Sequence, residues 1–378
     1  MARLGDICDV RDGTHDSPPY VNKGYPLVTS KNIVDGILDL SVINHITLED
    51  YNKINERSKV DSGDIIMPMI GTIGNPYLVG EFTEFAIKNV ALIKFNNEQI
   101  NNKYIYYFLN SNKFKKYIAE TNRGGTQKFL SLKDIRNMEV NIASLDKQLE
   151  IVEILDKISG LIYDRKQQVL KLDEFVKSRF IELFGDPETN PKGLKMVLLP
   201  EIAEYFNGLT YTPDNVSEGG TIVLRSSNIQ NSQLDFADTV RVDCSIKERL
   251  FVKDNDILMC SRNGSARLVG KVAIIKNLSE PMTFGAFMMI IRSKYYPYLM
   301  TYFQMDAFRR QIKTGATTTI NQITGNMLNK IILPLPEMAE INEFATFVEQ
   351  TDKLKFEVKE SLEKLETLKK SLMQQYFG

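Results

Sequence analysis

KQLEIVEILDKISGLIYDRKQQVLKLDEFVKSRFIELF, residues 147–184, is the stretch that decides the fold. Its apolar residues recur at alternating spacings of three and four, the heptad pattern of a helix that packs against another helix. Arg165 and Arg179 interrupt this seam, and their aliphatic stems can lie along it with the charged heads in water. At ~1.5 Å per residue the helix is on the order of 50–60 Å long, so its apolar stripe needs a partner. The seam residues are Ile151, Leu155, Ile158, Ile162, Val169, Leu172, Val176 and Leu183.

A second stretch of the same kind covers residues 338–377. The pattern assigns Leu354, Val358, Leu365, Leu368 and Leu372 to its seam, with Ser361 at the position where an apolar residue is skipped. Since each helix needs an apolar partner, we expect the two to pack antiparallel as a coiled coil within one chain. The alternative interpretation is two unrelated long surface helices.

Both stretches end in Phe-Gly, and this match belongs to a tandem repeat with an offset of about 193 residues. The paired motifs occur in the same order in both halves, which predicts two similar units. They are Leu4-Gly5-Asp6-Ile7 with Leu199-Pro200-Glu201-Ile202, Asp12-Gly13-Thr14 with Asn207-Gly208-Leu209, Thr29-Ser30-Lys31-Asn32-Ile33 with Arg225-Ser226-Ser227-Asn228-Ile229, Gly63-Asp64-Ile65-Ile66-Met67 with Asn255-Asp256-Ile257-Leu258-Met259, Gly71-Thr72 with Gly264-Ser265, Tyr107-Phe108 with Tyr302-Phe303, and Phe114-Lys115 with Phe308-Arg309.

Each unit is predicted to contain a globular α/β part followed by its long helix. Short apolar runs predict strands, and amphipathic patterns predict helices over residues 104–118 and 297–312. Leu333-Pro334-Leu335-Pro336 predicts a stiff, extended lead-in to the second long helix. The strand-like runs are Ile65-Ile66-Met67, Val90-Ala91-Leu92-Ile93, Ile257-Leu258-Met259 and Met288-Met289-Ile290-Ile291.

The predicted fold class is mixed, α+β. Two globular α/β domains, residues 1–143 and 194–336, are joined by two long antiparallel helices, residues 144–185 and 337–378, in a pseudo-two-fold tandem repeat. Residues 186–193 hold turn and breaker residues only, and we interpret them as the linker between the units.

Composition narrows the function classes. The chain has 378 residues and a formal net charge of −1, so bulk charge does not indicate a nucleic-acid partner, and such a site must come from local clusters. The three cysteines are scattered and there are two histidines, so no metal-ligand spacing arises. No secretory leader or membrane-length apolar run is recognised, and we expect a protein of the reducing cytoplasm.

Ser17-Pro18-Pro19-Tyr20 matches the catalytic loop of methyltransferases that act on the amino groups of adenine or cytosine. That chemistry needs a neighbouring cofactor fold with a glycine-rich loop after a strand, which the sequence does not contain. We therefore favour a loop stiffened by proline. Two histidines also leave no Ser/His/Asp or Cys/His set, and we expect no catalytic residues and no bound metal.

Polar and basic loops recur at matched places in both units. Cations accompanied by Gly, Thr, Asn and Gln are the side chains that hold phosphates and read base edges, whereas the alternative is an ordinary solvated loop. The predicted contact residues are Thr29, Ser30, Lys31, Asn32, Thr72, Asn75, Arg123, Gly125, Thr126, Gln127 and Lys128 in the first unit, and Arg225, Ser226, Ser227, Asn228, Arg262, Asn263, Ser265, Thr317, Thr318, Thr319 and Asn321 in the second.

In these motifs the chain resembles the specificity (S) subunits of type I restriction–modification enzymes. The resemblance covers nearly the whole chain and depends above all on the doubled domain and helix. The motifs that carry it are Asp12-Gly13-Thr14-His15, Thr29-Ser30-Lys31-Asn32-Ile33, Gly63-Asp64-Ile65-Ile66, Gly71-Thr72-Ile73-Gly74, Gly125-Thr126-Gln127-Lys128 and Leu333-Pro334-Leu335-Pro336.

The resemblance implies two target-recognition domains, each reading one half of a split double-stranded DNA sequence, with the helices as a ruler between the halves. It also implies two docked methyltransferase (M) subunits and possibly two restriction (R) subunits. S-adenosylmethionine, ATP and Mg²⁺ are then expected on those partners only. Two alternatives stay open: a DNA amino-methyltransferase that uses Ser17-Pro18-Pro19-Tyr20, and a coiled-coil scaffold without a DNA role.

Overall fold

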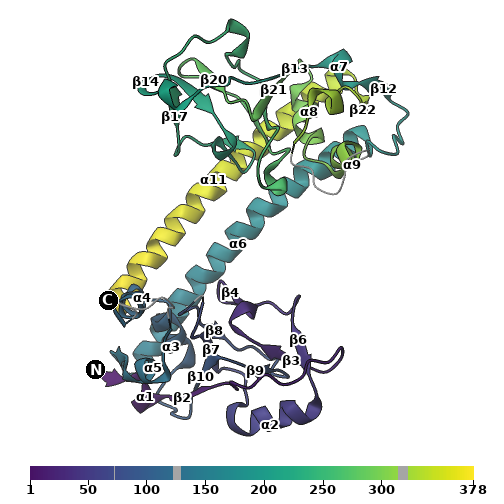
Figure 1. Cartoon of the computed structure of the whole chain (residues 1–378). Helices are drawn as coiled ribbons and strands as arrows, with labels where there is room; N and C mark the ends of the chain where they lie inside the picture. Colours follow the sequence, from purple (N-terminus) through teal and green to yellow (C-terminus); the bar gives the residue numbers. More distant parts are fainter. Residues whose placement is uncertain (72, 122–128, 314–321) are drawn as a thin grey trace. The chain divides into compact units, whose positions relative to one another are not determined.

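The computed structural model describes residues 1–378 except 72, 122–128 and 314–321 (Figure 1). The chain forms two compact units, the first made of Met1–Gln167 and Lys359–Gly378, the second of Gln168–Val358. Each long helix therefore contributes a segment to both units.

The first unit begins with a short strand and ends in the long helix α6. Its elements are β1 (Ala2–Arg3), α1 (Leu4–Ile7), β2 (Asp9–Asp12), β3 (Tyr25–Val28), η1 (Ser30–Asn32), β4 (Ile33–Val34), β5 (Ile37–Leu38), β6 (Asn44–Ile46), α2 (Leu48–Ser58), β7 (Ile65–Pro68), β8 (Tyr77–Leu78), β9 (Ala86–Ile87), β10 (Val90–Lys94), α3 (Asn102–Leu109), α4 (Asn112–Thr121), α5 (Leu132–Asn137), β11 (Glu139–Val140) and α6 (Leu145–Phe184).

The second unit follows the same plan and ends in the long helix α11. Its elements are β12 (Lys195–Leu198), α7 (Leu199–Ile202), β13 (Glu204–Asn207), η2 (Pro213–Asn215), β14 (Val216–Leu224), η3 (Ser226–Asn228), β15 (Ile229–Gln230), β16 (Gln233–Leu234), β17 (Val240–Val242), η4 (Glu248–Leu250), β18 (Ile257–Cys260), η5 (Ala266–Leu268), β19 (Val272–Ile274), β20 (Met282–Phe284), β21 (Met288–Arg292), α8 (Tyr296–Tyr302), α9 (Asp306–Lys313), α10 (Gly325–Leu328), β22 (Ile332–Leu335) and α11 (Met338–Phe377).

The sheets of the two units correspond strand by strand. The four-stranded sheet β2-β10-β7-β8 matches β13-β21-β18-β19, and the three-stranded sheet β6-β3-β9 matches β17-β14-β20. The pairs β1-β11 and β4-β5 likewise match β12-β22 and β15-β16. The predicted tandem repeat is thus confirmed in the topology. The helices differ in three places: α2 of the first unit stands where the second unit has the short η4, and η2 and η5 occur in the second unit without a described counterpart in the first.

The central strands are apolar except for the cation at the end of β10 and of β21, because both of their faces are covered. In β7 and β10, Ile65, Met67, Ala91 and Ile93 belong to one core cluster, which includes residues of α3, α5 and α6. The alternating residues Ile66, Val90 and Leu92 belong to a second cluster on the other side. In the second unit β18 and β21 alternate between two clusters in the same way.

The repeated Gly13 and Gly208 are required by close backbone contact. A Cβ at Gly13 would lie 2.2 Å from the Ile87 carbonyl oxygen, and one at Gly208 would lie 2.2 Å from that of Phe284. The following residues, Thr14 and Leu209, donate their N–H groups to those same oxygens. Any larger side chain would therefore separate the strand from its neighbour.

The repeated Asp64 and Asp256 are buried anchors. Lys94 Nζ donates to Asp64 Oδ2 at 2.6 Å, and Arg292 binds both carboxylate oxygens of Asp256 at 2.7 Å. Both cations lie at the end of the equivalent strand, β10 or β21. The motif that precedes β7 and β18 thus serves the fold rather than a ligand.

The two long helices are present as predicted, and each ends in a left-handed glycine. Gly185 has φ +77° and Gly378 has φ +89°, a conformation that glycine adopts without strain. Their N–H groups donate to Ile181 O at 2.8 Å and Gln374 O at 2.9 Å, which satisfies carbonyls of the last turn. This explains the matched Phe-Gly ends.

The seam predicted for α6 is correct, because each of its residues is buried or half-buried. The seam predicted for α11 is wrong at two positions: Leu354 and Leu368 are 53% and 47% exposed. The buried and half-buried residues of α11 that keep the alternation of three and four are Ile341, Phe344, Val348, Thr351, Lys355, Val358, Leu362, Leu365, Lys369, Leu372 and Tyr376.

Within each unit the segments of α6 and α11 run antiparallel. In the second unit Asp173 pairs with Lys355 and Arg179 with Glu343, so positions rise along α6 as they fall along α11. In the first unit Lys166 pairs with Glu366, while the end of α11 at Phe377 shares a cluster with Ile151 near the start of α6.

The two amphipathic helices predicted over residues 104–118 and 297–312 are each broken into two. In the first unit α3 ends at Leu109 and α4 begins at Asn112, and Ser111 Oγ accepts from Phe114 N–H at 3.3 Å as α4 starts. In the second unit α8 and α9 are separated at the matching place. Across the described residues, no helix has the length and apolarity to cross a membrane.

Replacing Phe344 with alanine tests whether the long helices belong to the cores. Phe344 is fully buried between Phe180 and Phe184, with ring centroids 5.7 and 5.4 Å away. We expect Phe344→Ala to lower the free energy of unfolding by about 3–5 kcal/mol in urea titrations. The control Phe356→Ala, in the same helix but 62% exposed, should change it by less than ~0.5 kcal/mol. Equal losses would contradict this packing.

Candidate nucleic-acid interface

The loops that begin at Thr29 and Arg225 have the same internal architecture. Asn32 Oδ1 accepts from the backbone N–H and the hydroxyl of Thr29, both at 3.0 Å, and Nδ2 donates to the carbonyls of Asp39 and Val42 at 3.1 Å. Asn228 likewise accepts from Arg225 N–H and donates to two carbonyls, those of Asp235 and Asp238.

This use of the two asparagines changes the role expected for them. Asn32 and Asn228 are buried, and the four hydrogen bonds of Asn32 use the full capacity of its amide. They therefore hold the loop, and in this conformation the Asn32 amide has no capacity left for a base edge. Ser30, Lys31, Ser226 and Ser227 are half-buried or exposed and remain predicted contact residues.

Arg225 is held at the loop by an acidic neighbour. Its Nη2 lies 2.8 Å from Asp238 Oδ2. Within the described part of the chain, its buried Nε has no hydrogen-bond acceptor. A buried donor without a partner is uncommon, and when it occurs at a binding loop it is a candidate for a ligand contact.

The structure brings two predicted loops of the second unit together. Asn263 Nδ2 donates to Ser226 Oγ at 3.2 Å, which joins two of them, and Ser265 N–H donates to Asn263 Oδ1 at 2.9 Å. Arg262 forms an isolated β-bridge with Gln322, the first described residue after 314–321. The sequence separates these loops by tens of residues, so only the fold shows that they converge.

The first unit has the matching arrangement around the end of β7. Ile70 bridges to Phe129, the first described residue after 122–128, and Leu130 N–H donates to Met69 O at 2.9 Å. Asn75 is half-buried nearby in sequence. Ten predicted contact residues lie outside the described residues: Thr72, Arg123, Gly125, Thr126, Gln127, Lys128, Thr317, Thr318, Thr319 and Asn321.

Sequence reasoning missed the aromatic residues of this region. Phe287 is 59% exposed, and the Arg262 guanidinium lies 5.3 Å from its ring centroid. Phe129 is 47% exposed beside Ile70. Aromatic faces and stacked arginines are groups on which nucleic-acid bases can stack. No local signal in the sequence distinguishes these phenylalanines from core residues.

Ser17-Pro18-Pro19-Tyr20 lies in the loop between β2 and β3. The strands of the four-stranded sheet in the first unit pair antiparallel throughout, unlike the parallel sheet that holds S-adenosylmethionine in methyltransferases of this motif. Ser17 Oγ accepts from Lys88 Nζ at 2.5 Å. The methyltransferase interpretation is therefore not favoured.

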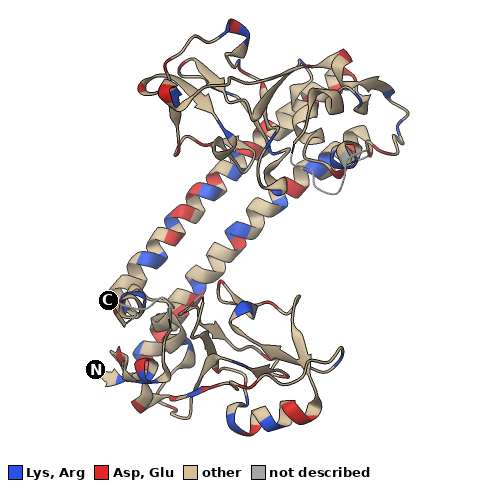
Figure 2. Ribbon diagram, viewed as in Figure 1, with Lys and Arg blue, Asp and Glu red and all other residues tan. Residues whose placement is uncertain are grey.

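Charged residues of both signs alternate along the long helices. Figure 2 shows Lys and Arg interspersed with Asp and Glu along both long helices. Across the described residues, no group of three or more His, Cys, Asp and Glu side chains is arranged to hold a metal.

Comparison with known proteins identifies the family. A family model described as the type I restriction modification DNA specificity domain matches residues 1–172 and 191–369. The type I restriction enzyme EcoKI specificity subunit of Escherichia coli (strain K12) is 23% identical over 391 residues, covering 95% of this chain and 83% of that protein. The putative specificity subunit S.HindORF215P of Haemophilus influenzae is 35% identical over 124 residues, covering 32% of this chain and 30% of that protein.

Two solved structures have the same fold along the whole chain. The S subunit of a type I restriction–modification system from M. genitalium aligns with a TM-score of 0.56 and 14% identity, covering 100% of this chain and 95% of that one. A second solved structure, described as the structural basis of complex assembly and conformational transition of the type I R-M system, aligns with a TM-score of 0.54 and 18% identity. The alignment covers 100% of this chain and 96% of that one. Because the family model spans most of both repeats, this chain belongs to the family of type I restriction–modification DNA specificity domains.

Proposed function

We propose that this chain is the DNA sequence-specificity subunit of a type I restriction–modification complex. Its two globular parts, residues 1–143 and 194–336, each read one half of a bipartite double-stranded target. The proposal rests on one observation: both units have the same strand topology, but their side chains differ at matched loop positions. Thr29-Ser30-Lys31 stands in the first unit where Arg225-Ser226-Ser227 stands in the second, so the two half-sites differ in sequence.

The long helices act as one continuous antiparallel coiled coil that sets the spacer between the half-sites. The heptad alternation runs through the whole of α6 and α11, and within each unit the two segments already contact each other in antiparallel order. Helices of about 60 Å suit half-sites a helical turn or more apart, at ~34–36 Å per turn.

Two methyltransferase subunits dock on this chain. Relatives carry the name of specificity subunits of type I restriction enzymes. The long helices also expose large apolar side chains outside the seam, a feature of docking surfaces. These are Leu149, Leu161, Tyr163, Leu170, Phe175, Ile181, Leu354, Phe356 and Leu368.

The chain itself is non-catalytic in this proposal, and S-adenosylmethionine, ATP and Mg²⁺ are bound by the partner subunits in the cytoplasm. With a net charge of −1 the chain alone neutralises few phosphates, so much of the affinity for DNA comes from the assembled complex.

Exchanging residues 1–143 for the corresponding part of a relative with another target tests whether each unit recognises its half-site independently of the other. We expect one half of the methylated sequence to change and the other half to stay, because each unit has its own core. Methylome sequencing of cells that express each version gives the result. The reciprocal exchange of residues 194–336 is the control and should change only the other half. A change in both halves, or in neither, would contradict the proposal.

Inserting one heptad into each long helix, after Gln167 and after Val358, tests whether the length of the helices sets the spacer. A heptad keeps the seam in phase and adds ~10 Å, so the spacer should lengthen by about three base pairs while both half-sites stay the same. The control inserts the same seven residues between 186 and 193, outside the helices, and should leave the spacer unchanged. An unaltered spacer in the helix variant would exclude the ruler role.

A further inference from the structure

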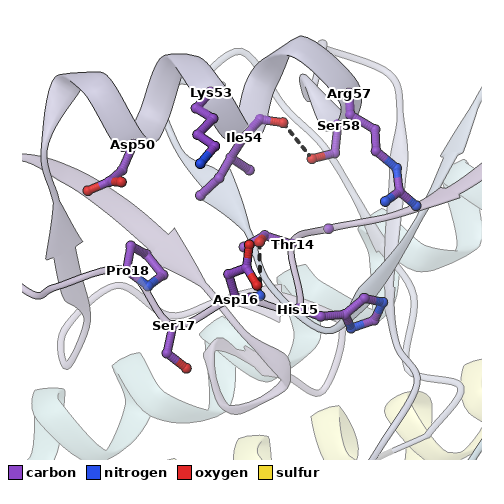
Figure 3. Close-up of a pocket in the computed structure, with 11 residues that line it drawn as sticks. Thr14, His15, Asp16, Ser17, Pro18, Asp50, Lys53, Ile54, Arg57 and Ser58 are labelled. Atoms are coloured by element: carbon purple, nitrogen blue, oxygen red, sulfur yellow. Dashed lines mark hydrogen bonds between the residues drawn. The ribbon is translucent and has the colours of Figure 1, made fainter.

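A pocket of about 490 Å³ lies in the first unit between α2 and the loop that follows β2. Figure 3 shows Lys53 and Arg57 reaching from α2, with Thr14, His15 and Ser17 on the opposing loop. This loop contains Asp12-Gly13-Thr14-His15, a motif that the proposed half-site loops do not use. The pocket lies wholly within one unit and outside the contact residues predicted from the sequence.

A buried carboxylate contacts His15 and Arg57 at the edge of this pocket. Asp12 is 6% exposed. Its Oδ2 lies 2.8 Å from His15 Nε2, and its Oδ1 accepts from Arg57 Nη2. The other ring nitrogen, His15 Nδ1, lies 2.8 Å from Asn89 Oδ1. Because both partners of the ring accept hydrogen bonds, the doubly protonated imidazolium satisfies both contacts by donation.

Arg57 and Lys53 are exposed side chains that line the pocket from α2 (Figure 3). The Arg57 side chain is 67% exposed and uses one of its five N–H donors on Asp12. Lys53 lies one helical turn earlier, on the same face of α2. The carboxylate of Asp50 lies at the other end of the pocket and accepts from the Thr47 hydroxyl at 2.8 Å (Figure 3). The cationic end is thus the Arg57 end.

The second unit lacks this arrangement. Asn207 stands at the position of Asp12, and Thr210 at that of His15. The place of the eleven-residue α2 is taken by the three-residue η4. The cluster of Asp12, His15 and Arg57 occurs in the first unit only, so the topology that both units share does not require it.

We propose that Arg57 and Lys53 bind a backbone phosphate of the DNA strand in the half-site of the first unit, and that Asp12 and His15 set the charge of this contact. The proposal rests on the proposed function and deepens it. A guanidinium and an ammonium beside hydroxyl groups suit phosphate oxygens, whereas the exposed position and mixed charge suit a contact that positions the duplex.

The charge of the cluster depends on His15. Among Asp12, Arg57 and His15, the carboxylate offsets Arg57 while His15 is neutral, and protonation of His15 leaves one net positive charge. The carboxylates of Asp16 and Asp50 also line the pocket, and Lys53 adds a second cation. The pKa of His15 is raised by its hydrogen bonds to Asn89 and then to Asp12, while burial and Arg57 oppose the increase. The extra charge is fully present below the ordinary pKa of ~6.5 and is lost as pH rises through the raised pKa.

The test measures binding of the complete S–M complex to duplex DNA that carries the methylome-defined target, as a function of salt. Arg57→Gln and Lys53→Gln should each reduce the slope of log K against log salt by about one, and affinity at ~0.15 M salt by about five-fold. The loss should be equal for the target and for single base-pair variants of it. Arg249→Gln, in the η4 that replaces α2 in the second unit, is the matched control and should leave the slope unchanged.

The pH arm compares the two histidines of the chain. Affinity should fall by up to about five-fold between ~pH 6 and ~pH 8.5 in the wild type and in His45→Gln, and this difference should shrink in His15→Gln. Unaltered salt slopes in both α2 variants, or a loss confined to one base pair, would overturn the phosphate assignment. If the wild-type complex shows no target-specific binding at all, the proposed function fails as well, and the two failures are thereby distinguished.

Discussion

The burial of the long-helix ends in the globular cores is the interaction on which the rest of the structure depends. In the second unit Phe180 and Phe184 of α6 pack with Phe344 of α11 around Tyr298. In the first unit Phe377 of α11 packs against Tyr104 and Phe108. Because each core contains segments of both helices, neither segment can rotate or slide within its unit without opening that core.

The repeated loops show how one fold can present two different sets of candidate DNA-contacting side chains. Asn32 and Asn228 close the loop by bonding to the main chain, so the shape of the loop depends little on the side chains around it. Thr29 can therefore be replaced by Arg225 at the matching position without a change in backbone. The side chains that differ between the units occupy exposed and half-buried positions next to Asn32 and Asn228.

The two units also differ in how their charge is arranged. The first unit gathers His15 and Arg57 around a buried Asp12 under an additional helix, whereas the second unit ties Arg225 to Asp238 at the loop itself. In both places a carboxylate restrains a cation near a candidate contact surface. Such pairing limits non-specific attraction to DNA by a chain of nearly neutral net charge, and it keeps the arginine positioned before a ligand arrives.

The sequence alone determined the tandem repeat, the two long helices, the α6 seam and the central strands, because spacing and motif order are local properties of the chain. It misassigned Leu354 and Leu368 in α11, since an apolar stripe one position away from the true seam looks equally good in sequence. The tertiary structure decided that phase: anchoring of Ile341 and Phe344 in the core sets the alternation that brings Lys355 beside Asp173. It also decided that Asn32 is a brace, that Asn263 meets Ser226, and that Arg57 joins His15 at Asp12, because these contacts link residues far apart in the chain and depend on how the sheets and helices pack.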